Sequence, residues 1–216
     1  MSGKQVLRLG LAALFGAAYL WLGHLASISA DPPLVSIIMG LAPLTASAVV
    51  LVWHSRSVGL QLLCAACLIG MVLEIDFLRS NTAWVYLIQH AGMHIMLGVM
   101  FGRTLSHGYA GALCSRISCF VYPEPLNDAF FRYAWKVTLV WTIYFAAAAT
   151  VSILLFFFGP REAWSIFANL LTPVLIGAIF VIEYLVRLRA LPQRQHISIA
   201  QTIRAYREYS QRTTPR

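Results

Sequence analysis

Charged residues are scarce in this chain, and acidic residues are the scarcest. Only 11% of the 216 residues are charged, with 8 Asp and Glu against 16 Lys and Arg, while 59% are hydrophobic. In a soluble protein, the net charge of +8 would suggest a nucleic-acid partner. Here the basic residues flank long apolar runs, so anionic lipid headgroups explain them better and we expect no nucleic-acid partner.

Cysteines and catalytic signature motifs are also few. The four cysteines give no disulfide framework. Cys64 and Cys67 match C-x-x-C inside an apolar run, where hydrocarbon disfavours the thiolate that redox or metal chemistry needs. The chain has no G-x-S-x-G, Walker loop, H-E-x-x-H or Rossmann glycine pattern, which argues against a hydrolase, an ATPase and a zinc protease. None of these patterns points to a cofactor or a metal.

What the chain does have is long apolar runs, each close to the length that crosses a bilayer core. They predict an all-α fold, a polytopic membrane helical bundle in which residues 1–190 form a single six-helix transmembrane domain. No room remains for a separate soluble catalytic domain. The predicted spans are 9–28, 34–53, 58–75, 83–101, 137–158 and 166–186.

The basic residues predict the orientation of this bundle. If the six runs all cross the membrane, 14 of the 16 Lys and Arg residues fall on one side. Only Arg79 and Arg161 fall in loops on the other side. Because positive residues stay on the cytoplasmic side, both termini are expected in the cytoplasm.

Two segments on that side are long enough to form structure of their own. In the segment 103–132, apolar residues at Tyr109, Leu113, Ile117 and Phe120 predict a short helix in the membrane interface. Asn127 or Asp128 is expected to cap the helix that leads into span five. The tail 191–216 is predicted to be a basic amphipathic helix that lies on the membrane or docks a cytoplasmic protein.

Prolines inside two spans predict bends. Pro43 lies in span two and Pro173 in span six, and each removes a backbone donor from its helix. Paired broken helices can mark a transport site in membrane proteins.

The first candidate site surrounds the turn between spans three and four. His90 and His94 are four residues apart and share a helix face, and Glu74 and Asp76 close the preceding span. Three interpretations stay open. The four side chains could bind a divalent metal, line a polar or proton pathway, or form hydrogen bonds between helices.

The second candidate set lies in spans five and six. Glu183 and Arg187 form an i,i+4 pair at the cytoplasmic end of span six, and Asn169 lies in the same span. Arg132 and Lys136 are four apart at the cytoplasmic start of span five, where they could flank a lipid headgroup or a carrier phosphate. We interpret these five residues as contacts to a lipid or a partner, with ordinary structural pairing and anchoring as the alternatives.

Several aromatic and polar positions in the C-terminal half agree in order and spacing with a known family. They are Phe131-Arg132-Tyr133, Lys136-Val137-Thr138, Trp141, Phe145, Trp164, Phe167-Ala168-Asn169 and Glu183-Tyr184-Leu185-Val186-Arg187. Over about residues 98–190 the chain resembles small, uncharacterised bacterial inner-membrane proteins that are encoded with aryl-polyene or fatty-acid-synthase-like gene clusters. The resemblance implies an inner-membrane location, with membrane lipids and an acyl carrier protein or synthase components as partners. His90 and His94 are not part of the shared pattern.

These observations lead to three functional hypotheses. The first is an accessory protein that assists synthesis or export of a lipid-linked acyl or polyene product. The second is a small lipid or solute transporter or flippase, suggested by the prolines and the polar residues within spans. The third is an intramembrane enzyme that uses the region of His90 and His94, with Glu74 and Asp76.

Overall fold

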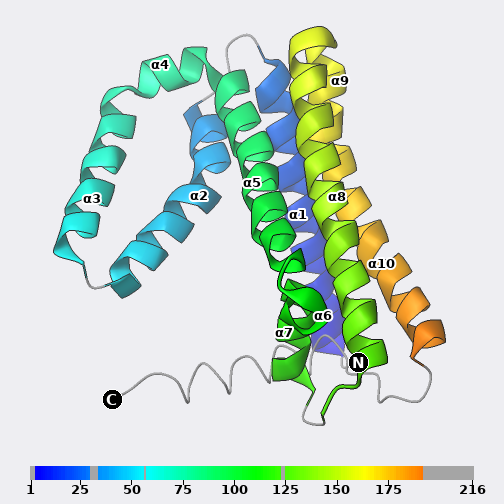
Figure 1. The fold of residues 1–216 in the computed structure, drawn as a ribbon. Coiled ribbons are helices and arrows are strands. Elements are labelled where there is room, and N and C mark those ends of the chain that lie inside the picture. Colours follow the sequence, from blue (N-terminus) through cyan, green and yellow to red (C-terminus); the bar gives the residue numbers. More distant parts are fainter. Residues whose placement is uncertain (1–2, 30–33, 56, 123–124, 192–216) are drawn as a thin grey trace. The chain divides into compact units, whose positions relative to one another are not determined.

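The structure is a computed structural model that describes residues 3–29, 34–55, 57–122 and 125–191. Every regular element within these residues is a helix, which confirms the predicted all-α class (Figure 1). In chain order they are α1 Gly3–Ile28, α2 Leu34–Ser55, α3 Val58–Leu73, α4 Ile75–Ser80, α5 Thr82–Leu105, α6 Gly108–Gly111, α7 Leu113–Val121, α8 Asp128–Phe158, α9 Arg161–Ser165, the π-helical turn η1 Ile166–Leu171 and α10 Thr172–Ala190.

Three helical stretches have the length and apolar composition that a membrane span needs. They are Thr82–Leu105, Asp128–Phe158 and Arg161–Ala190, the last of which comprises α9, η1 and α10. Shorter apolar stretches occur at Leu14–Ile28 of α1 and at Val58–Leu73. The chain is therefore a helical protein with the composition of a membrane protein.

The chain folds as two compact units. Unit 1 comprises Met1–Met93 and Thr150–Val174, and unit 2 comprises His94–Ala149 and Leu175–Arg216. The long helices α5, α8 and α10 contribute residues to both units.

The core of unit 1 forms around Trp164, whose side chain is fully buried. Ala26 of α1 and Tyr86, Leu87 and Ala91 of α5 complete the buried cluster. Phe156 meets the Trp164 ring edge to face, with 5.1 Å between ring centroids. This aromatic contact packs α8 against α9. Helix α1 contacts α9 and η1 directly.

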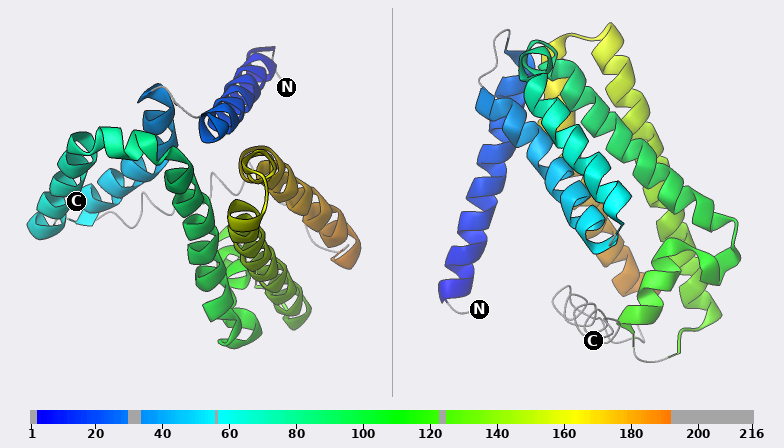
Figure 2. Two further views of the ribbon diagram at one scale, coloured as in Figure 1. Left: turned by 90° about the horizontal axis from the view of Figure 1, so that it is seen from above. Right: turned by 90° about the vertical axis from the view of Figure 1, so that its left-hand side faces the viewer.

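Helices α2 and α3 lie side by side in unit 1 (Figures 1 and 2). Helix α3 begins at Ser57, whose hydroxyl accepts a hydrogen bond from the backbone N–H of Leu60, and it has no buried residue. Gly40 of α2 approaches Tyr86 so closely that an added Cβ would lie 2.9 Å from the ring. A small residue at this position lets the helix backbone come close to its neighbour.

In unit 2, hydrogen bonds fasten the short helix α7 to the longer helices α5 and α8. Thr104 of α5 accepts a bond from the backbone N–H of Leu113, and Thr138 of α8 accepts one from Cys114. The Trp135 indole donates to the carbonyl of Leu105 at 3.1 Å. Trp141, which stacks on Phe145, anchors the aromatic core of this unit.

Several local predictions can be compared with these elements. The expected short helix after Tyr109 is present as α7, and Asn127 caps α8 by accepting the N–H of Phe130 at 3.0 Å. The turn expected between spans three and four contains the extra helix α4. Helix α2 runs through position 43 as continuous helix. The predicted tail helix lies outside the described residues.

Candidate functional site

A buried polar cluster joins α1 to α9 and η1 within unit 1. It consists of His24, Ser27, Ser165 and Asn169, and we call it the His24 cluster. His24 Nδ1 and Ser165 Oγ are hydrogen bonded at 2.7 Å. The Asn169 amide donates to the hydroxyls of Ser27 and Ser165, each at 3.2 Å. His24, Ser27 and Ser165 are all buried, so the cluster links α1 to the last apolar stretch through polar contacts.

His90 forms a second set of polar contacts in the same unit. Its Nδ1 lies 3.0 Å from the hydroxyl of Ser152 on α8, and its Nε2 lies 3.1 Å from the hydroxyl of Thr172 on α10. The Trp164 indole also donates to Ser152, at 3.1 Å. Each imidazole nitrogen therefore has a hydroxyl partner on another helix. This geometry supports the prediction of hydrogen bonds between helices.

The π-helical turn η1 places Thr172 beside His90. The backbone N–H of Thr172 bonds to the carbonyl of Phe167, five residues back, and the Thr172 hydroxyl donates to the same carbonyl at 2.8 Å. Pro173 follows at once and has no N–H to continue the α-helical pattern. A π turn, in which backbone hydrogen bonds span five residues, accommodates the missing donor. A π turn therefore immediately precedes the helix that contains Pro173, where the sequence predicted a bend.

The carboxylates proposed as partners of the histidines lie elsewhere in this unit. Glu74 separates α3 from α4, Asp76 lies in the first turn of α4, and both are exposed. Across the described residues, no group of three or more His, Cys, Asp or Glu side chains could hold a metal ion. The structure therefore gives the metal interpretation of this set no geometric support.

His94 belongs to unit 2 and has mainly aromatic surroundings. Its side chain is buried, and its ring meets Tyr144 and Phe145 edge to face, with centroid separations of 6.1 and 5.9 Å. The i,i+4 spacing puts His90 and His94 on one helix face, but the two side chains differ in their neighbours. His90 bonds to two hydroxyls and meets the Phe167 ring edge to face, whereas His94 packs against Tyr144 and Phe145.

Tyr133, Glu183 and Arg187 form a polar group between α8 and α10 in unit 2. The Tyr133 hydroxyl lies 3.1 Å from both Oε1 and the backbone carbonyl of Glu183. Arg187 Nε lies 3.6 Å from Glu183 Oε1, so the predicted i,i+4 ion pair is present. The Arg187 guanidinium also lies over the ring of Tyr184. The bond from Tyr133 to Glu183 therefore links α8 to α10 in unit 2.

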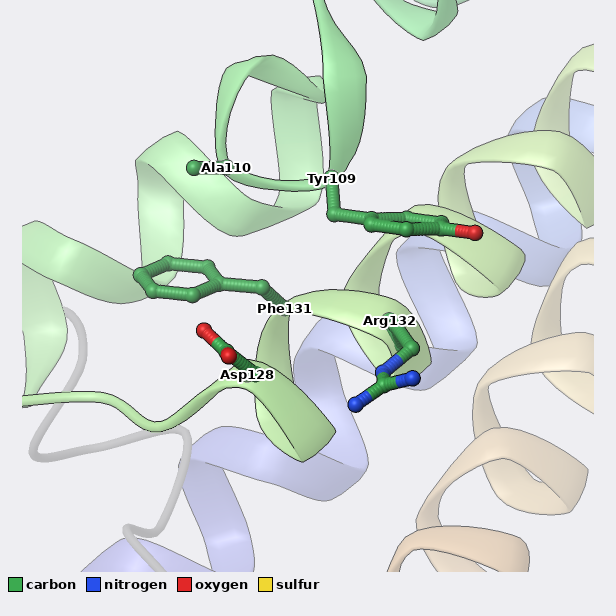
Figure 3. Close-up of a pocket in the computed structure, with 5 residues that line it drawn as sticks. All are labelled: Tyr109, Ala110, Asp128, Phe131 and Arg132. Atoms are coloured by element: carbon green, nitrogen blue, oxygen red, sulfur yellow. The ribbon is translucent and has the colours of Figure 1, made fainter.

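Arg132 lines a pocket of about 450 Å³ at the beginning of α8 (Figure 3). We call it the Arg132 pocket, and its lining residues are Tyr109, Ala110, Asp128, Phe131 and Arg132. In Figure 3 the rings of Tyr109 and Phe131 lie above the charged groups of Asp128 and Arg132. A pocket of this size, with apolar walls and a few charged groups, is typical of small-molecule sites. Lys136 is exposed one turn further along α8 and does not line this pocket.

Cys114 of α7 lies near this pocket in sequence but is not suited to thiolate chemistry. Burial raises the pKa of the Cys114 thiol, and the nearby Glu183 carboxylate raises it further, although a hydrogen bond with Thr138 acts in the opposite direction. At neutral pH the thiol is therefore protonated. It packs as a small side chain in the joint between α7 and α8.

Sequence reasoning missed His24, Ser165 and Ser152, which carry much of the buried polar network. Each lies in a largely apolar run that matches no catalytic or metal-binding motif, although Ser27 follows His24 by three residues and Asn169 follows Ser165 by four. Their partners are distant in sequence, as with the 141 positions between His24 and Ser165. The cost of an isolated polar residue in a membrane helix was the one usable signal.

Comparisons of the chain with protein-family models, with curated proteins and with solved structures find no match. The residues that carry the family resemblance can still be judged by their surroundings. Trp164 and Thr138 are fully buried, Trp141 and Phe145 are core residues, and Tyr133 clamps Glu183. Much of this pattern therefore describes how helices pack, whereas Phe131 and Arg132 line the Arg132 pocket.

Proposed function

We propose that the chain is a six-span protein of the bacterial inner membrane with both termini in the cytoplasm. Three helical stretches that could each cross a membrane support a multi-span arrangement, and α1, α2 and α3 cover the other three apolar runs. The uneven distribution of the 16 basic residues supports the orientation. On this topology, the Arg132 pocket opens on the cytoplasmic side.

Within that topology we propose an accessory role in the synthesis or export of a lipid-linked acyl or polyene product. The observation that carries this proposal is the Arg132 pocket, which combines a guanidinium with two aromatic side chains. A guanidinium pairs with phosphate oxygens through two parallel hydrogen bonds, and aromatic rings pack against an acyl or polyene chain. The ligand that fits is an amphipathic molecule with one anionic group, delivered by the membrane or by an acyl carrier protein.

Two features of the pocket refine this proposal. Asp128 lies one turn before Arg132 and also lines the pocket, so a ligand with a single anionic group is favoured over one with several. Lys136 is exposed on the next turn and adds positive charge for an approaching headgroup or carrier. Asn169, Glu183 and Arg187 bond within the protein, which favours a structural role for them.

Mass spectrometry of the purified protein with its bound lipids tests this role. The wild-type protein should retain an anionic acyl or polyene lipid at a level above its abundance in the membrane, and Arg132→Ala should lose it. Arg116→Ala is the matched control, since Arg116 is exposed on α7 in the same predicted cytoplasmic segment but does not line the pocket. Equal retention by all three proteins would contradict the proposal.

A transporter or flippase is the second candidate, and the π turn η1 favours it. This turn brings Thr172 to His90 in unit 1, and π-helical turns occur frequently at functional sites. Broken helices with buried polar groups are also found in transporters. If deletion of the gene leaves the distribution of lipids and pigments between leaflets unchanged, this candidate should be abandoned.

The third hypothesis, an intramembrane enzyme, has less support from the geometry. Both nitrogens of His90 bond to hydroxyls, His94 packs against rings, and Glu74 and Asp76 are exposed. Full complementation of the deletion by a variant with all four residues replaced would end this hypothesis.

A further inference from the structure

A second basic pocket lies in unit 1 and contains the two arginines that depart from the charge pattern. Arg79 of α4 and Arg161 of α9 are the two basic residues outside the predicted cytoplasmic side. They come from helices far apart in the sequence, yet both line one pocket of about 110 Å³. We call it the Arg79–Arg161 pocket, and its lining residues are Ser29, Arg79, Ser80, Asn81, Thr82, Ala83, Trp84 and Arg161.

Internal hydrogen bonds fix the turn that forms one wall of this pocket. The Asn81 amide donates to the carbonyl of Phe77 at 2.9 Å, and the Thr82 hydroxyl donates to the carbonyl of Arg79 at 2.7 Å. The Ser80 hydroxyl also donates to Phe77, at 2.9 Å. The hydroxyl and amide groups therefore organise the turn, and the two guanidinium groups supply the positive charge of the pocket.

The charge of the pocket selects an anion. Its described lining contains two arginines and no acidic residue. Asp76 and Glu162, which are close to the arginines in sequence, are exposed and are not among the lining residues. Each guanidinium has five N–H donors in a planar fork, so it can hold an internal contact and still bind an oxyanion.

The size of the pocket limits what can enter it. A volume of about 110 Å³ has room for one phosphate or carboxylate group. The Trp84 side chain is 45% exposed at this site. Partly exposed tryptophans in membrane proteins favour the headgroup region, where a phosphate would be at hand.

We propose that Arg79 and Arg161 form a binding site for one phosphate or carboxylate group, either on an anionic lipid headgroup or on a free anion. The site is separate from the Arg132 pocket and has a different lining. Only its assignment to the outer side of the membrane rests on the proposed topology. The binding chemistry itself does not depend on the function proposed above.

Binding measurements on the full chain in nanodiscs test this site. One arm uses nanodiscs of a zwitterionic lipid and titrates inorganic phosphate by calorimetry. The other arm adds phosphatidylglycerol to the nanodiscs and measures bound lipid by native mass spectrometry. Either probe should bind the wild-type protein, and the double variant Arg79→Ala/Arg161→Ala should bind it about tenfold more weakly or worse.

Two further variants keep the test decisive. Arg103→Ala/Arg116→Ala removes the same charge from exposed arginines outside both pockets and should bind the probe like the wild type. Arg79→Lys/Arg161→Lys keeps the charge but loses the planar forks, so it should bind with intermediate strength. A response to phosphatidylglycerol alone identifies a headgroup site, and a response to phosphate identifies a free-anion site. Absence of both responses, or equal binding by the wild-type protein and the alanine variant, would overturn the proposal.

Discussion

The two arginine-containing pockets of this molecule differ in size, charge and lining. The Arg132 pocket has a volume of about 450 Å³, two aromatic side chains and one charge of each sign. The Arg79–Arg161 pocket has about 110 Å³, two positive charges and mainly polar neighbours. The first suits an amphipathic molecule with one anionic end, whereas the second suits a small oxyanion group. Under our two proposals, the neighbours of each arginine decide which kind of ligand its pocket would bind.

This difference also shows how to interpret the charge pattern of a membrane protein. Basic residues on the predicted cytoplasmic side are explained by topology alone, so their number says little about binding. Arg79 and Arg161 oppose that trend, and the structure brings them to one pocket. The two arginines that depart from the positive-inside rule are therefore more informative about binding than the other basic residues.

The largest expected effect comes from replacing the core tryptophan of unit 1, the unit that contains the Arg79–Arg161 pocket. Trp164→Ala should lower the free energy of unfolding by about 3–5 kcal/mol, because it opens a cavity in the core. It also removes the indole bond to Ser152. Thermal unfolding in detergent measures the effect, with Phe158→Ala as the control, since Phe158 is 85% exposed. Equal losses in the two variants would show that Trp164 is not the core of unit 1.

The corresponding change in unit 2 should be smaller. Thr138→Val keeps the shape of the side chain but removes the acceptor of the Cys114 N–H and the donor to Ala134. Leaving a buried N–H without a partner costs about 1–3 kcal/mol. We expect a lower unfolding temperature together with weaker lipid retention at the Arg132 pocket, because α7 loses a hydrogen bond to α8. An unchanged unfolding temperature would argue against this role of Thr138.

A change within the Arg132 pocket would sharpen the comparison directly. Asp128→Asn makes this pocket resemble the other one by removing its negative charge. An anionic ligand should then bind about two- to fivefold more tightly, as expected for one partly solvated charge. The variant should lose slight stability, because Asp128 lies in the first turn of α8, where a negative charge is favourable. Weaker binding of an anion would contradict the proposed polarity of the pocket.

The smallest expected effect concerns the reactivity of Cys114 of α7, which lies near the Arg132 pocket in sequence. Burial raises its pKa, so the thiolate is depleted near neutral pH and alkylation should be slow. Cys119 is exposed on the same helix and serves as an internal reference. Because the pKa of Cys114 is raised in the folded state, the folded protein favours the protonated thiol. The resulting contribution to folding stability is present below the ordinary thiol pKa and is lost as the pH rises through the raised pKa. Maleimide labelling followed by peptide mass spectrometry should find Cys119 modified first, and the reverse order would contradict the burial of Cys114.

Periodicity and composition predicted the helices well, because apolar runs and capping residues act locally. The run before Leu105, the cap at Asn127 and the short helix after Gly111 all correspond to elements of the structure. The Glu183–Arg187 pair was also predictable, since i,i+4 neighbours meet on any helix.

The buried polar contacts could not be predicted in the same way. His24 and Ser165 meet only because α1 packs against α9, and that packing depends on side chains distributed over much of unit 1. Grouping His90 with Glu74 and Asp76 relied on closeness in sequence, whereas the partners of His90 come from α8 and α10. The convergence of Arg79 and Arg161 likewise depends on tertiary structure.

The most direct test of the account is the orientation of the chain, on which the sidedness of both pockets depends. Two variants in spheroplasts measure it, one with Cys119 as its only cysteine and one with Glu162→Cys as its only cysteine. A membrane-impermeant maleimide should label position 162 in intact spheroplasts and Cys119 only after permeabilisation. Labelling of Cys119 in intact spheroplasts, with position 162 protected until permeabilisation, would contradict the proposed topology.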